Sequence, residues 1–504
     1  MLKVVLVDPP APDCMINPMP VLGLGILRTF LESKGYEVET IDLAIRVRYL
    51  NRFFFRRIFN LKLFDNDERI INFLNGKNDD ALKDQVEKMI RLGRLTDYDV
   101  IGFNFVTINV RFALCLAKVL KEDYDKKIIL GSALTSRTDH SDLLKFDFVD
   151  FLIVGDGEEP FLRILKYFES GETIENCAGI FYKKDGKIHR GMPTSFPIEE
   201  KANPSFNPDD LKLHKKLSVK GLSILPYLIS RGCKYKCAFC FEYKNTFFEY
   251  KPVEKVVSDI KSLKAGYNTN FIFFVEGNLN NDPAYMKTLS ERIIYEKLNI
   301  WWGGFATITG LNEEIIKVMA QSGCKLLMIG VESGSEIISS KMNLQKKKDF
   351  EKFKETLKLL HKYGVGTHCF YIVEFPYETN EDFQKNLDFI KETAKYTTTA
   401  AASAYQLLEN STAFLVPKIL NIKIRERNSS KYNFFDRFWK FDEIDGLKWE
   451  EKSEKGQIKE KITLKTIFKE IELRFILKSL LKNPLYIIRK KISYPYISYD
   501  EYFI

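Results

Sequence analysis

The 504-residue sequence lacks several features that would assign it quickly to a class of protein. It has no uncharged run of about 18 residues, so no membrane-spanning helix is predicted. The segment from Met1 to Asp8 is strand-like, and we expect no signal peptide. The net charge of +9, from 77 basic and 68 acidic residues, is too small for a dedicated nucleic-acid binder. There are no internal repeats and no low-complexity stretches.

Histidine is scarce, with five in the chain and none between His214 and His361. Five of the eight cysteines are scattered singly among apolar neighbours, which favours a reducing cytoplasm over a disulfide framework. The length suggests roughly two to four domains. An apolar content of 45% with 29% charged residues is typical of a soluble globular protein.

The other three cysteines are clustered. Cys233, Cys237 and Cys240 follow a strand-like run, 222–229, with the spacing Cys-x3-Cys-x2-Cys. Three thiolates at a strand end can bind three irons of a [4Fe-4S] cubane and leave the fourth iron open to a substrate. A zinc knuckle and unrelated core thiols are the alternatives. Zinc sites of this kind usually show paired Cys-x2-Cys or a following histidine at a set spacing. No histidine lies between His214 and His361 to act as a fourth ligand, and the spacing with its flanking Gly232 and Phe239 favours a redox cluster.

This stretch, with Phe239 before its last cysteine, resembles the signature of the radical S-adenosylmethionine (SAM) enzymes. The resemblance implies that SAM chelates the open iron and is cleaved to a 5′-deoxyadenosyl radical. It also implies SAM contacts at Phe239, at Glu276 and Asn278 after the second strand, and at Glu332 after the fourth. Glu332 has a structural alternative, which is to cap the helix that follows it.

From residue 216 to about 415, strand-like runs alternate with helices. Six such units predict a partial (β/α)6 barrel of the TIM type, with functional groups at the carboxyl ends of the strands. A turn-rich stretch, Asn203 to Asp210, precedes them, and we expect a linker at 201–215. A helical segment is expected at 416–504. This segment either forms a lid over the barrel or makes peripheral contact with a membrane, and the sequence does not decide between the two roles.

Three positions depart from the pattern of the family. Its fifth strand usually ends with glycines where this chain has Glu374 and Tyr377, and its third strand often carries an arginine where Thr307 follows Ala306. Either the backbone after the fifth strand differs, or two new side chains point into the barrel mouth.

Residues 1–200 also alternate between strand and helix, apart from an insertion at about 44–95. The alternation predicts a Rossmann-like, doubly wound parallel sheet. This domain resembles the cobalamin-binding domain that precedes many radical SAM modules. The resemblance implies cobalamin contacts at six positions: Leu22, Gly23, Thr107, Gly131, Gly155 and Glu158. The Asp-x-His-x-x-Gly motif is absent, and the loop from Asp8 to Asn17 has no histidine to ligate cobalt. A Rossmann-like domain that has lost its ligand is the alternative.

The part of the insertion from Ile45 to Leu63 is basic and aromatic and contains no acid. Such a helix can lie on an anionic membrane surface. The alternative is an ordinary insertion helix whose aromatic rings pack on the neighbouring domain while its arginines face water, and we favour this second interpretation.

Together these features predict an enzyme that cleaves SAM with a [4Fe-4S] cluster. The resemblance implies cobalamin-dependent methyl transfer to an unactivated carbon. Radical cyclisation or rearrangement without cobalamin turnover is one alternative, and a non-catalytic iron-sulfur and cobalamin sensor is another. We expect a small-molecule or peptide substrate, an electron donor such as flavodoxin or ferredoxin, no nucleic acid partner and a cytoplasmic location.

Overall fold

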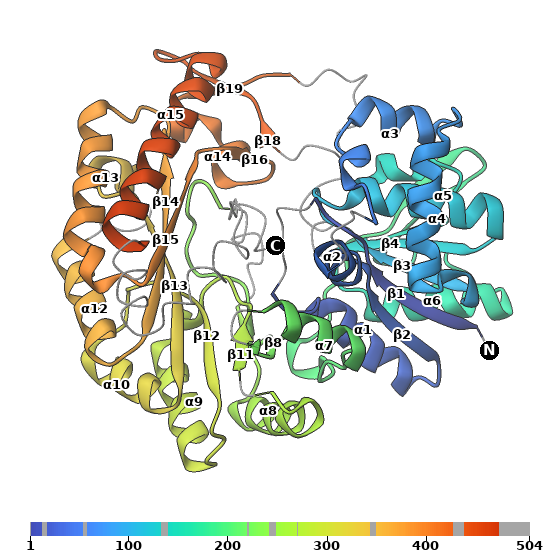
Figure 1. Ribbon diagram of the computed structural model, residues 1–504, viewed down its shortest axis with the longest axis horizontal. Helices are drawn as coiled ribbons and strands as arrows, with labels where there is room; N and C mark the ends of the chain where they lie inside the picture. Colours follow the sequence, from blue (N-terminus) through green and yellow to red (C-terminus); the bar gives the residue numbers. More distant parts are fainter. Residues whose placement is uncertain are drawn as a thin grey trace. The chain divides into compact units, whose positions relative to one another are not determined.

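The computed structural model describes residues 2–12, 18–53, 58–132, 140–218, 221–240, 248–269, 271–342, 349–426 and 438–472. The chain divides into two compact units, with the boundary between Ser223 and Ile224 and with residues 438–472 in the second unit. Each unit packs helices on one main sheet (Figure 1). No helix in these ranges is both long enough and apolar enough to cross a bilayer.

The first unit contains a seven-stranded sheet of order β2-β1-β3-β4-β5-β6-β7. The first five strands in this order are parallel and consist largely of buried apolar residues, as expected for a sheet covered on both faces. The predicted Rossmann-like sheet is therefore confirmed. The strands are β1 (Lys3–Asp8), β2 (Glu37–Asp42), β3 (Val100–Asn104), β4 (Lys127–Ser132), β5 (Phe151–Val154), β6 (Ile180–Lys184) and β7 (Lys187–Arg190).

The last two strands, β6 and β7, form an antiparallel hairpin that the sequence analysis did not predict. The turn between them is Asp185-Gly186, and both residues have positive φ angles, of 50° and 74°. Asp-Gly is a strong signal for a two-residue hairpin, so the hairpin was readable in the sequence.

Three helices connect successive strands of this sheet, and three more form the insertion. The connecting helices are α1 (Leu22–Ser33), α5 (Val110–Tyr124) and α6 (Glu158–Ser170). The insertion contains α2 (Leu43–Phe53), α3 (Asp67–Leu74) and α4 (Asp80–Gly93). Helix α7 (Pro208–Leu217) begins inside the predicted turn-rich stretch, because the Asn207 side chain caps it and Pro208 suits its first turn.

The insertion packs within the first unit. Val47 and Phe59 belong to the buried apolar cluster that also contains residues of the sheet, α4 and α5, and Ile45 is buried as well. Arg46 Nε lies 2.6 Å from Asp210 Oδ1. These residues pack as an ordinary insertion, but Phe59 packs within its own unit, and Arg46 is paired with a buried carboxylate instead of facing water. Residues 54–57, which carry some of the aromatic and basic side chains, lie outside the described residues.

The second unit contains a six-stranded parallel sheet of order β15-β14-β13-β12-β11-β8. All six strands fall on predicted runs, and the partial barrel is confirmed. The strands are β8 (Ile224–Tyr227), β11 (Phe271–Phe274), β12 (Trp301–Ala306), β13 (Cys324–Glu332), β14 (Gly366–Val373) and β15 (Thr399–Ala404). The helices are α8 (Val253–Tyr267), α9 (Pro283–Tyr295), α10 (Glu313–Gln321), α11 (Glu336–Met342), α12 (Phe350–Lys362) and α13 (Asn380–Thr393). Cys324 and Cys369, two of the five singly placed cysteines, are buried in the core.

The C-terminal part is more varied than the predicted helical segment. It contains two small antiparallel strand pairs, which join β16 (Leu407–Leu408) to β18 (Phe438–Trp439) and β17 (Ile422–Ile424) to β19 (Phe441–Glu443). The short helix α14 (Thr412–Leu415) lies between β16 and β17 in the chain. Helix α15 (Trp449–Ile467, red in Figure 1) then packs against the edge strand β15. The rest of the predicted helix, and the basic residues near 490, lie outside the described residues.

Candidate active site

The three clustered cysteines lie in one loop of the second unit. The loop leaves the carboxyl end of β8 through the short strand β9 (Ser230–Arg231), and it carries Cys233, Cys237 and Cys240, all half-buried. This is the edge of a parallel sheet at which such folds bind their ligands.

Backbone hydrogen bonds fix the later half of this loop. The Cys240 N–H donates to the Cys237 carbonyl over 3.1 Å. Ala238, between them, donates to the Met342 carbonyl at the end of α11 over 2.7 Å and accepts from the Ala413 N–H in α14 over 2.8 Å. The side chain of Phe239 packs, half-buried, against the apolar cluster around Phe375 and Tyr405. The loop is thus held between α11 and α14.

A carboxamide holds the earlier half of the loop. Asn281 Nδ2 donates to the Gly232 carbonyl over 3.2 Å, and its Oδ1 accepts from the Lys234 N–H over 3.3 Å. One side chain therefore bonds the backbone on both sides of Cys233. The ammonium group of Lys234 also donates to the Asn281 carbonyl. The sequence analysis missed Asn281, although it lies only three residues beyond the predicted Asn278.

Asn278 is buried and supports Asn281. Its Nδ2 donates to Asn281 Oδ1 over 2.9 Å, and its Oδ1 accepts from the Thr307 N–H over 3.0 Å. Both polar groups of the side chain therefore have protein partners. The predicted contact of Asn278 with SAM remains a prediction.

Glu276, only 3% exposed, also contacts the strand that leads to the cysteines. Its Oε1 accepts from the N–H groups of Ile229 and Ser230. Its Oε2 is buried and has no hydrogen-bond partner among the residues that the structure describes. Burial raises the pKa of Glu276 to about 7, against the opposing effect of the two N–H donors. The carboxyl group thus has one oxygen bonded to the loop and one available to a ligand.

Glu332 lies at the end of β13 and is half-buried, with a φ of 61°. The strand pairing shifts register between Gly330 and Glu332, and the carboxyl group rests beside Gly330, where a Cβ would collide with it. In the helix that follows, the Ile338 N–H donates to Ser335 Oγ over 3.4 Å. Ser335 therefore provides the capping contact that was the structural alternative for Glu332.

Glu374 and Tyr377 keep the backbone that glycine would favour, with φ angles of 56° and 61°. The Glu374 carboxyl group contacts α15, at 2.6 Å from Lys459 Nζ and 3.4 Å from Lys452 Nζ. The Tyr377 hydroxyl donates to the Asn421 carbonyl over 2.8 Å. Both expected alternatives thus need correction, because the backbone has the positive φ angles that glycine favours and these side chains bond to the C-terminal segment.

The contacts of Glu374 belong to a buried network of charges. Lys459 also lies 2.9 Å from Glu378, and Lys452 lies 2.8 Å from Glu443 in β19. Burial raises the pKa of Glu378, against the pull of Lys459. Seven residues, or nearly two helical turns, separate the two lysines, so they share one face of α15. That spacing is the only sequence signal for this network.

In the first unit, four of the predicted cobalamin contacts lie at the carboxyl edge of the sheet. Leu22 and Gly23 begin α1, Thr107 follows β3, and Gly131 lies near the end of β4. An added Cβ would meet nothing within 4 Å at Gly23 and only Ile153 at 3.6 Å at Gly131. Within the described ranges, the immediate surroundings of the backbone are therefore open at Gly23 and hold only an ordinary contact at Gly131.

The other two predicted contacts have structural partners. Gly155 has a φ of 94°, and a Cβ there would lie 2.3 Å from the Thr194 carbonyl oxygen, so the close backbone requires glycine. Glu158 is buried, with its Oε1 2.5 Å from Lys201 Nζ. Their contact with cobalamin stays a prediction.

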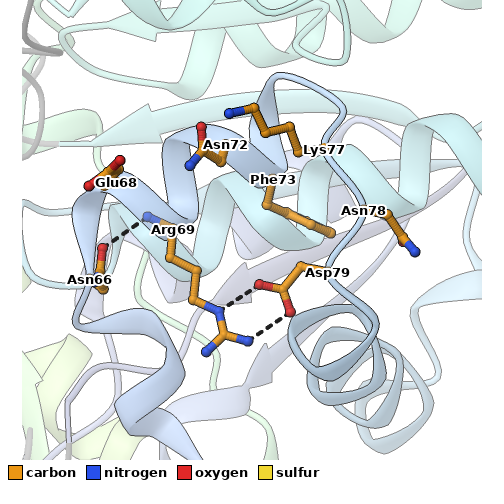
Figure 2. Close-up of a pocket in the computed structure, with 8 residues that line it drawn as sticks. All are labelled: Asn66, Glu68, Arg69, Asn72, Phe73, Lys77, Asn78 and Asp79. Carbon is orange, nitrogen blue, oxygen red and sulfur yellow. Dashed lines mark hydrogen bonds and ion pairs between the residues drawn. The ribbon is translucent and has the colours of Figure 1, made fainter.

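A pocket of about 360 Å³ lies elsewhere in the first unit, between α3 and the start of α4 (Figure 2). Its Arg69 and Asp79 bond each other through two contacts, of 2.6 and 2.7 Å, and so neutralise each other. None of the predicted site residues lines it.

In the described ranges, no three His, Cys, Asp or Glu side chains converge closely enough to hold a single metal ion. Each cysteine ligand of a cubane binds a different iron, so the donor set for a cluster need not meet at one point. Three thiols on one anchored loop at a strand end are the donor set that a [4Fe-4S] cluster requires.

Residues 227–390 match the family model for the radical SAM superfamily, so this part of the chain carries a radical SAM domain. The relatives of this chain include a methyltransferase and a cyclase. Cytidylyl-2-hydroxyethylphosphonate methyltransferase from Streptomyces wedmorensis is 23% identical, over 77% of both chains. An anaerobic magnesium-protoporphyrin IX monomethyl ester cyclase from Rubrivivax gelatinosus is 22% identical, over 74% of this chain and 67% of the cyclase.

Among solved structures, the radical SAM methyltransferase TsrM from Kitasatospora setae, with cobalamin and a [4Fe-4S] cluster bound, has a TM-score of 0.63. It is 14% identical, over 92% of this chain and 88% of TsrM. At this identity the likeness establishes a shared fold.

Proposed function

We propose that this chain binds a [4Fe-4S] cluster through Cys233, Cys237 and Cys240, cleaves SAM with it and transfers a methyl group with the help of cobalamin to an unactivated carbon of a small-molecule substrate. The observation that carries the proposal is the anchored loop, which holds three half-buried thiols at the carboxyl end of β8 within the matched radical SAM region. An electron donor such as flavodoxin or ferredoxin would reduce the cluster.

The cluster, when bound, supplies the electron that cleaves SAM. The chain's own residues bind and orient the SAM molecule. The unpartnered Oε2 of Glu276 is an acceptor suited to the SAM ammonium group. Phe239 offers an aromatic face for the adenine, and the Glu332 carboxyl group can accept from ribose hydroxyls.

Cobalamin, when bound, supplies the methyl carrier. Leu22, Gly23, Thr107 and Gly131 line the carboxyl edge of the first sheet, where a doubly wound fold binds its ligand. The room beside Gly23 and Gly131 supports this assignment, and so does the cobalamin reported with TsrM. Glu158 and Gly155 would then fix the loop that follows β5.

The first test measures 5′-deoxyadenosine formed by the anaerobically purified protein with SAM and a chemical reductant. We expect the product from the wild type and only background from Cys237→Ala, because a cubane with two cysteine ligands is not held. Cys177→Ser, which changes a single cysteine of the first unit, is the control and should match the wild type. An intact cluster that yields no deoxyadenosine would refute the proposed cleavage.

The second candidate is radical cyclisation or rearrangement, which the likeness to the protoporphyrin ester cyclase favours. Metal analysis after cobalamin supplementation separates it from methyl transfer. Cobalt bound in a ratio near one per chain supports methyl transfer, and label from methyl-labelled SAM should then appear in the product. Absence of cobalt would leave cyclisation or rearrangement as the reaction.

A further inference from the structure

The cysteine loop is anchored in two independent ways. Main-chain hydrogen bonds of Ala238 hold the part that carries Cys237 and Cys240. The part that carries Cys233 is held by the side chain of Asn281, with Glu276 on the strand before it. Because this second anchor consists of side chains, it can be removed by mutation without altering the cysteines.

The side chain of Asn281 has a hydrogen-bond partner for each of its donor and acceptor positions. It is 4% exposed. Its Nδ2 donates to the carbonyls of Gly232 and Asn278, and its Oδ1 accepts from Asn278 Nδ2 and the Lys234 N–H. A carboxamide offers two donors and two acceptor positions, so all of its capacity is used.

The bond to the Gly232 carbonyl matters most. Gly232 has a φ of 88°, a conformation that glycine can adopt but also leave at little cost. Without a partner for its carbonyl, the peptide before Cys233 would be free to rotate and would carry the thiol with it. Asn278 in turn bonds the Thr307 N–H after β12, which ties this anchor to the sheet.

We propose that Asn281 is a positioning residue that fixes the backbone around Cys233 before the cluster assembles, an inference that rests on the proposed function. It touches neither SAM nor the reacting atoms in this role. Its loss should therefore loosen one ligand of three while the rest of the barrel stays folded.

The experiment compares the wild type with Asn281→Ala and Asn281→Asp, each loaded with iron and sulfide under anaerobic conditions. The readouts are iron per chain and the rate at which a chelator removes the cluster. Removal of outer-shell partners typically weakens metal binding 10- to 100-fold, so we expect cluster loss about tenfold faster in both variants. The aspartate variant tests the donors, because it keeps the size but faces two carbonyls with a carboxylate.

Asn51→Ala is the matched control. Asn51 also holds both backbone groups of one residue, Phe59, at 2.9 and 3.0 Å, but in the first unit. The Asn51→Ala substitution should lower the free energy of unfolding and leave the rate of cluster loss unchanged. If the wild type takes up the cluster and both Asn281 variants retain it equally well, the inference is overturned alone. If the wild type takes up no cluster, the proposed function is overturned and the inference falls with it.

Discussion

The cysteine loop and helix α15 are both segments that the barrel strands do not hold by themselves, yet different chemistry holds each. Around Cys233 the contacts come from the neutral amides of Asn278 and Asn281 and from one carboxyl group aimed at backbone N–H groups. At α15 they come from two lysines and three glutamates.

The difference follows from what each anchor must bond. A carboxamide both donates and accepts, so one side chain can satisfy the N–H and C=O groups of a loop. Helix α15 has no free backbone groups in its interior and can be held only by its side chains. Buried charges do this strongly when all are paired, and removal of one partner leaves an uncompensated charge. We therefore expect a single substitution to destabilise the α15 contact more than the contact around Cys233.

The largest effect is expected from Lys459→Met. Lys459 is 7% exposed and contacts both Glu374 and Glu378. Its loss leaves two buried carboxylates with one lysine fewer, at a cost of about 3–5 kcal/mol. The amide groups of residues 449–467 should therefore exchange hydrogen faster than in the wild type. Lys455→Met changes an exposed residue of the same helix and should stay within about 0.5 kcal/mol of the wild type. Equal exchange in the two variants would refute the charge network as the anchor.

Glu276→Gln tests the other anchor through its pH dependence. The pKa of Glu276 is raised from 4.5 to about 7, so between these values the folded protein holds a proton that the unfolded chain has lost. Wild-type stability should therefore fall as the pH rises through this window, by about 3 kcal/mol relative to the glutamine variant. Denaturant unfolding of the cluster-free protein at pH 4.5, 6 and 7.5 measures it. Parallel pH profiles would contradict the expected neutral carboxyl group.

The smallest effect is expected from Gly456→Ala in α15. A Cβ there would lie 3.0 Å from Ala404 Cβ, so the helix would be pushed from β15. Overpacking costs about 1–3 kcal/mol and exceeds the roughly 1 kcal/mol gained from helix propensity. Gly266→Ala in α8, where a Cβ meets nothing within 4 Å, should be stabilising, and thermal unfolding of both variants should show opposite signs. Shifts of the same sign would contradict the close approach of α15.

Much of the fold was accessible from local sequence signals. Strands and helices alternate at short intervals, and the three cysteines fall within eight residues. Because both patterns are local, they can be recognised without knowledge of distant contacts. The hairpin β6–β7 was missed although its Asp-Gly turn is also local. Gly155 has a structural requirement that the sequence does not show, because Thr194 lies against its backbone, while its contact with cobalamin stays a prediction.

What the tertiary structure alone decided is where the polar side chains find their partners. The sequence by itself determined the two sheets and the loop with Cys233, Cys237 and Cys240. It left open whether Glu374 points into the barrel mouth, because its partner Lys452 lies 78 residues away. Likewise, the bonds of Asn281 to Gly232 span 49 residues. Hydrogen bonds and ion pairs over such separations have no periodic signature, so only the folded backbone brings them together.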